Sequence, residues 1–207
     1  TMVFSYLWWV CLGVIQPQTQ DGHNKRLRKF AGRITLIVCL QIVLGGLMAG
    51  IKAGLLFNHF PHMEVDYSDQ SWIWIADVLK DQSMWTWENM RNYNASDGFA
   101  AAFIQLLHRG TAYLLCILIP LLFLNIKRIH HSKQLTIGAY SMLFILIFQV
   151  VLGILTLLNG VGQIPLFFGV LHQAFGLLLL ASMLYIVYQF GSGGHQVKLQ
   201  TSKQESV

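Results

Sequence analysis

The stretch FGVLHQAFGLLLL, residues 168–180, is almost entirely apolar except for one imidazole, His172, and the neighbouring Gln173. It lies within an apolar tract over residues 165–190, which is longer than the roughly 20 residues that an α-helix needs to cross a bilayer. Ionisable side chains are costly inside a membrane and usually serve a function there. The stretch therefore predicts a membrane-spanning helix that carries a functional histidine.

The composition extends this prediction to the whole chain. Of its 207 residues, 55% are hydrophobic and 11% are charged, whereas a soluble domain has about a quarter of its residues charged. Apolar tracts at about 34–57, 99–124 and 137–158 are also long enough to span, whereas TMVFSYLWWVCLGVI at 1–15 is too short. We predict an all-α integral membrane protein, with a four-helix transmembrane bundle over 34–190. Residues 1–15 would be a partial transmembrane helix of a preceding half that the sequence lacks.

The charged residues predict the orientation of these helices. Basic residues concentrate in a loop at 16–33, around residues 127–133 and in the tail at 191–207, while seven carboxylates fall in the loop at about 58–97. Because positive charges favour the cytoplasmic side, we expect the basic segments inside and the acidic loop outside. This distribution explains the net charge of +5 without a nucleic-acid partner. The tail is rich in Gly and Ser, which predicts disorder.

An internal repeat relates two helix pairs. QIVLGGLMAG (41–50) resembles QVVLGILTLL (149–158), and LLHRGTAYLL (106–115) resembles VLHQAFGLLLL (170–180). Each copy contributes one histidine, His108 or His172, at a predicted depth of roughly 16 or 10 Å from the outer side. Since their helices run in the same direction, a bundle can bring both rings to its interior.

Two imidazoles without a neighbouring cysteine or carboxylate suit the axial positions of a heme iron better than tetrahedral zinc. Gly169 and Gly176 share the helix face of His172 and would leave clearance for a porphyrin edge. Arg109 could reach outward to a heme propionate. The alternative is that each histidine only forms a hydrogen bond to a neighbouring helix. The three cysteines lie in apolar tracts and predict neither disulfides nor a Cys metal site.

The outer loop offers two further features. His59 and His62 lie near Glu64 and Asp66, but a solvated loop is a better interpretation than a metal site, because no fixed ligand geometry is indicated. Several tryptophans are predicted to anchor the loop at the membrane interface or to cover the site. These are Trp72, Trp74, Trp85 and Trp87.

Five motifs in order resemble the C-terminal half of the heme A synthase family, in a form closer to bacterial than to mitochondrial members. They are AGIKAGLLFNHFPHM (49–63), WENM (87–90), FIQLLHRGTAYLL (103–115), QVVLGILTLLNGVGQIP (149–165) and GVLHQA (169–174). The resemblance implies a membrane oxidoreductase that converts the methyl group of heme O to the formyl group of heme A for terminal oxidases. It also implies that His108 and His172 are the axial ligands of a heme b.

The resemblance further implies how this chain would act and with what. The substrate heme O would bind through the missing N-terminal half, so the chain alone is expected to be inactive. Membrane lipid, heme O synthase, oxidase assembly factors and a second copy are the candidate partners, and the bacterial cytoplasmic membrane is the expected location, with the mitochondrial inner membrane as the alternative. Two other interpretations remain open: a non-enzymatic bis-histidine b-type cytochrome, and a transporter whose histidines relay protons.

Two positions depart from the family pattern. His59 stands where Thr or Ser is common, and the outer loop lacks the cysteine pair of some bacterial relatives. The second departure removes any thiol role on the outer side.

Overall fold

The computed structural model describes residues 1–15, 24–65, 72–73, 77, 79–80, 82–91, 99–129, 132–163 and 165–190. The predictions for the remaining residues lie outside this part of the chain. They concern the disordered tail at 191–207, the first half of the basic loop, and outer-loop residues such as Asp66, Trp74 and Asp97.

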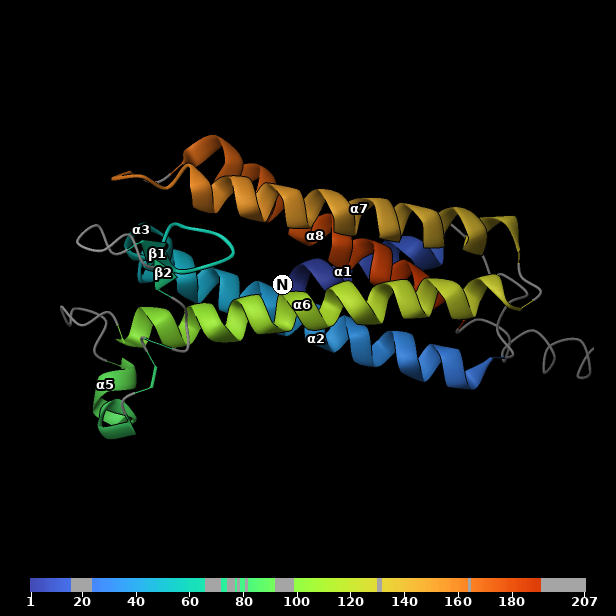
Figure 1. Cartoon of the computed structure of the whole chain (residues 1–207). Coiled ribbons are helices and arrows are strands. Elements are labelled where there is room, and N and C mark those ends of the chain that lie inside the picture. Colours follow the sequence, from blue (N-terminus) through green and yellow to red (C-terminus); the bar gives the residue numbers. More distant parts are fainter. Residues whose placement is uncertain are drawn as a thin grey trace, which may run out of the picture. The chain divides into compact units, whose positions relative to one another are not determined.

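The described residues are mainly helical, and four helices are long and apolar enough to cross a membrane. This confirms the predicted all-α membrane bundle. The described part of the outer loop adds a two-residue antiparallel ladder, Glu64 to Ile73 and Val65 to Trp72, and two short helical turns. Figure 1 labels the main elements: α1 Met2–Ile15, α2 Lys25–Gly50, α3 Ala53–Leu56, β1 Glu64–Val65, β2 Trp72–Ile73, α5 Trp87–Arg91, α6 Phe99–Lys127, α7 Lys133–Leu158 and α8 Leu166–Gln189. A short 3-10 helix, η1, spans Gln82–Met84.

The first long helix differs from its predicted bounds of 34–57. Helix α2 begins at Lys25, within the segment predicted as a loop, because Asn24 caps it: the Leu27 N–H donates to Asn24 Oδ1 at 3.0 Å. Lys and Arg are also good helix formers. The helix ends at Gly50, since Lys52 adopts a left-handed conformation with φ of 54° before the short α3. The described part of the inner basic segment, from Lys25 to Arg33, therefore forms the first turns of α2.

Long-range contacts divide the chain into two compact units. Unit 1 comprises Thr1–Cys39, Leu115–Ile147 and Phe175–Val207, and unit 2 comprises Leu40–Leu114 and Phe148–Ala174. In unit 1, α1 packs against α8: the Trp8 indole N–H donates to the Ala181 carbonyl at 3.0 Å, and the Trp9 and Tyr188 rings meet edge to face. The short first helix is thus held by both polar and aromatic contacts.

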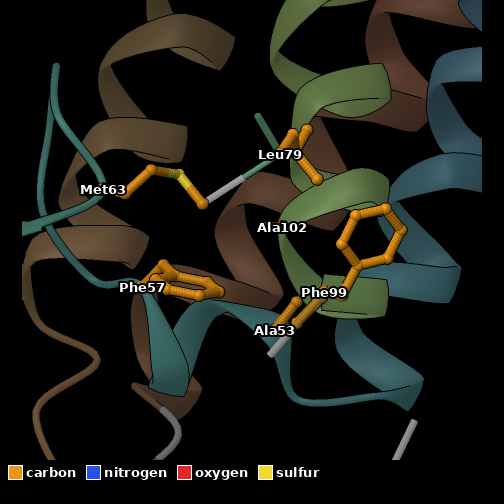
Figure 2. Close-up of a cluster of buried hydrophobic side chains, with 7 residues drawn as sticks. Ala53, Phe57, Met63, Leu79, Phe99 and Ala102 are labelled. Atoms are coloured by element: carbon orange, nitrogen blue, oxygen red, sulfur yellow. The ribbon is translucent and has the colours of Figure 1, made fainter. Parts of the chain in front are cut away.

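Unit 2 has a hydrophobic cluster at the start of α6, where outer-loop residues meet helix residues (Figure 2). Phe57 and Met63, which follow α2, are buried there together with Leu79 and Phe99. Trp85 lies on this cluster, because its indole N–H donates to the Leu79 carbonyl at 2.8 Å and its ring meets the Phe99 ring edge to face. The outer loop is therefore packed onto the helix that carries His108.

Candidate functional site

Both candidate ligand residues lie in unit 2. His108 is on α6 and His172 is on α8. The structure thus places both residues in the same compact unit, and their ligation of one iron stays a prediction. Each ring is held in place by residues of the first helix of its repeat, which is α2 for His108 and α7 for His172.

His172 is held by the backbone and by a side chain of α7. Its Nδ1–H donates to the Gln149 backbone carbonyl at 3.1 Å, and the Gln149 side-chain amide donates to Nε2 at 3.4 Å. A Cβ atom on Gly153 would lie 2.9 Å from Cε1 of the ring, so only glycine lets the imidazole approach α7 this closely. With Nδ1 as the donor, Nε2 keeps its lone pair for an acceptor or ligand role.

His108 has the same neighbours in the first repeat. The Gln41 amide on α2 donates to His108 Nε2 at 3.3 Å, and a Cβ atom on Gly45 would lie 3.2 Å from its Cε1. The Thr111 hydroxyl can donate to Gln41 Oε1, which orients the amide toward the ring. Nδ1 of His108 is buried and has no hydrogen-bond partner among the described residues. The first ring is thus positioned through side chains.

The predicted site residues did not include these two Gln-x-x-x-Gly pairs. Gln41 and Gly45 on α2 match Gln149 and Gly153 on α7, and each pair places an amide and a glycine one turn apart on one helix face. The signal was present in the aligned repeat, where both residues recur at the same positions. At the predicted Gly169, a Cβ atom would meet nothing within 4 Å, and the clearance for a porphyrin there stays a prediction.

Two further residues of α6 fix the outer loop. Gln105 is fully buried, and its amide donates to the carbonyls of Ala53 at 2.8 Å and Phe57 at 3.1 Å. Arg109 is 7% exposed and donates to the carbonyls at positions 59, 61 and 62, at 3.0, 3.2 and 3.3 Å. These two residues clamp the segment after α2 onto the helix turns that surround His108.

The outer histidines lie in this clamped segment. The His59 and His62 rings stack with centroids 5.4 Å apart. Within the described ranges, no group of three or more His, Cys, Asp or Glu side chains could hold a metal ion. Their backbone carbonyls accept hydrogen bonds from Arg109.

The donor set at His108 and His172 fits a heme iron. Such an iron takes its equatorial ligands from the porphyrin and needs only two axial donors from the protein, which two neutral imidazoles supply. In both rings Nε2 faces a glutamine amide, and ligation through Nε2 requires that amide to move aside. The glycines of α2 and α7 allow the Cε1 edge of each ring to approach a helix backbone closely.

The chain was compared with known proteins. The family model described as cytochrome oxidase assembly protein matches residues 1–184. A heme A synthase from Flavobacterium psychrophilum is 36% identical over 91% of this chain and 51% of the relative. Heme A synthases from Flavobacterium johnsoniae and Rickettsia massiliae are 29% and 33% identical, over 91% and 77% of this chain and 50% and 41% of the relatives.

The chain thus spans about half the length of the curated relatives that it matches. No solved structure matches it significantly. The four candidate spans and the bacterial relatives agree with a multi-pass protein of the bacterial cytoplasmic membrane. From the family match over most of its length, the chain belongs to the cytochrome oxidase assembly protein family, together with the bacterial heme A synthases.

Proposed function

We propose that this chain is the half of a heme A synthase that binds the cofactor heme b, with Nε2 of His108 and Nε2 of His172 as the axial ligands. The observation that carries the proposal is the matched pair: each histidine rests on the Gln-x-x-x-Gly face of the preceding helix, and both lie in one compact unit. The relatives named heme A synthase support the assignment.

The residues around the rings would orient them for ligation. The Gln149 carbonyl accepts from Nδ1 of His172 at 3.1 Å, and such a hydrogen bond fixes the ring and makes the other nitrogen a better donor to a metal. Gly45 and Gly153 let the rings lie close to the helix backbones. A heme bound in this way supplies one-electron chemistry, whose potential depends on its ligands and burial.

Arg109 is the proposed propionate contact. Among the described residues its hydrogen-bond partners are three neutral carbonyl oxygens, although the side chain is almost fully buried. A buried cation is strongly favoured by a nearby anion, and a heme propionate would supply that charge. Arg109 would then bind both the outer loop and the cofactor.

The oxidation of heme O to heme A is proposed for the full protein, in which the other half would bind the substrate. Heme O synthase and oxidase assembly factors remain the proposed partners. A non-enzymatic b-type cytochrome would use the same two histidines but would produce no heme A.

Heme content tests the proposal. The chain is purified from a heme-replete bacterial host, and its heme is extracted and identified as a pyridine complex. We expect one heme b per chain and a low-spin difference spectrum, both absent from the H108A/H172A double variant. A wild-type chain without heme contradicts the ligation proposal. The chain is then joined to an N-terminal half and assayed for heme A. Heme A formation would support the enzyme, and its absence would support the b-type cytochrome.

A further inference from the structure

A basic cavity lies in unit 1, whereas both histidines belong to unit 2. Its volume is about 610 Å³, which is within the range of about 300–1,000 Å³ that is typical of ligand sites. It is lined by residues from the start of α2 and the end of α6, at the ends of two membrane spans. The cavity is therefore at the level where lipid headgroups meet the protein.

The cations of this cavity come from two helices and converge. Arg26, Lys29 and Arg33 recur at i, i+3 and i+7 of α2, so they share one face of that helix. Arg128 faces the same cavity from just beyond the end of α6. No carboxylate is among the described residues that line it. Four positive charges thus meet with no carboxylate to balance them among the lining residues that the structure describes, which favours an anionic ligand.

Apolar and amide groups complete the lining. Leu27, Phe30 and Ile129 contribute hydrocarbon, and Asn24 and Asn125 contribute polar side chains. A free phosphate ion gains nothing from the hydrocarbon, whereas a phospholipid has acyl chains that follow it. Basic pockets between helices at the cytoplasmic end bind the headgroups of anionic lipids in other membrane proteins.

We propose that this cavity binds the phosphate of an anionic phospholipid headgroup, with Arg26, Lys29, Arg33 and Arg128 as its ligands and the apolar residues against its acyl chains. The orientation rule for membrane proteins requires basic residues on the cytoplasmic side but not their convergence. Lys25 and Arg28 show the difference. They are exposed on α2 in the same region, yet they do not line the cavity.

Native mass spectrometry of the full chain tests the proposal. The delipidated protein in detergent is titrated with phosphatidylglycerol, phosphatidylcholine or inorganic phosphate, and bound adducts are counted. We expect one phosphatidylglycerol to bind at least tenfold more tightly than phosphatidylcholine. Since each cation contributes about fivefold to anionic lipid binding, the R26Q/R128Q variant should lose roughly 25-fold.

The K25Q/R28Q variant is the matched control, because it removes the same charge from outside the cavity and should bind phosphatidylglycerol as the wild type does. Circular dichroism checks that each variant is folded. If the R26Q/R128Q variant does not fold, the single variant R128Q replaces it, and its affinity for phosphatidylglycerol should fall about fivefold. Equal binding of the two lipids, or equal losses in the cavity and control variants, would overturn the proposal. Displacement of the lipid by equimolar inorganic phosphate would show a free-anion site instead.

Discussion

The two histidine sites occupy equivalent places in the repeat, yet different groups hold their rings. A backbone carbonyl of α7 accepts from Nδ1 of His172 at 3.1 Å. The equivalent Gln41 backbone lies near His108 but forms no hydrogen bond with its Nδ1, and the hydrogen bond of His108 comes from the Gln41 side chain, which Thr111 orients. When the histidines are aligned, Phe175 stands at the position of Thr111. The comparison shows that one repeated helix pair can preserve a ligand position while its support changes.

The residues around the two rings differ because the loops that join the helices of each repeat differ in length. Gln105 and Arg109 of the first repeat align with Gly169 and Gln173 of the second. Gln105 and Arg109 are buried and form hydrogen bonds to the long outer loop. The second pair is joined by the short segment NGVGQIP at 159–165, which needs no such clamp. Gln173 is accordingly exposed.

The largest expected effect comes from adding a side-chain atom at Gly153, where the ring of His172 approaches α7. In G153A the new Cβ atom would lie 2.9 Å from the imidazole, and overpacking of this kind costs up to about 3 kcal/mol, or roughly 100-fold in heme affinity. G45A, where the distance is 3.2 Å, should lose less. Heme titration monitored at the Soret band measures both.

The adjacent Gly46 provides the control for this pair, because a Cβ atom there would meet nothing within 4 Å. G46A should therefore bind heme as the wild type does. If G153A and G46A bind heme equally well, the close approach of His172 to α7 is not required for ligation.

The next effect concerns the clamp that only the first repeat has. R109Q removes the hydrogen bonds to three loop carbonyls, and we expect a loss of about 2 kcal/mol in the stability of the outer loop. Limited proteolysis of the heme-free chain within residues 53–63 should accelerate, while Q173A should leave the rate unchanged.

R109K separates the two proposed roles of this residue. Lysine keeps the positive charge but cannot reproduce the planar guanidinium geometry. If Arg109 binds a propionate, R109K should retain most of the heme affinity that R109Q loses, although its loop is cleaved faster than in the wild type. Equal heme affinity in the wild type, R109K and R109Q would remove the propionate role.

The smallest effect compares the two glutamines. Each glutamine amide donates to Nε2 in the heme-free chain, and this hydrogen bond must break when Nε2 binds iron. Q149L should therefore strengthen heme binding by about 1 kcal/mol, or roughly fivefold, because the Gln149 backbone carbonyl still fixes the ring of His172. Q41L should gain less, because it also removes the hydrogen bond that positions His108. Heme titration of each variant measures the change, and a larger gain in Q41L than in Q149L would contradict the different support of the two rings.

Hydropathy and the repeat were sufficient to predict the four spans and the pairing of His108 with His172 in one region. The start of α2 was predicted too late, because hydropathy follows the membrane core and does not detect the Asn24 cap or a helix that extends beyond the lipid. The clamp by Gln105 and Arg109 could not be predicted either. It depends on which carbonyls the outer loop leaves exposed after the helix breaks at Lys52.

The central claim is that both histidines bind one heme iron, and the single variants H108A and H172A test it most directly. The absorption spectrum of each purified variant is recorded with and without added imidazole. We predict that each variant loses its low-spin bands and becomes high-spin, and that imidazole restores the low-spin state by replacing the missing ligand. An unchanged low-spin spectrum in either variant, without imidazole, would contradict the claim.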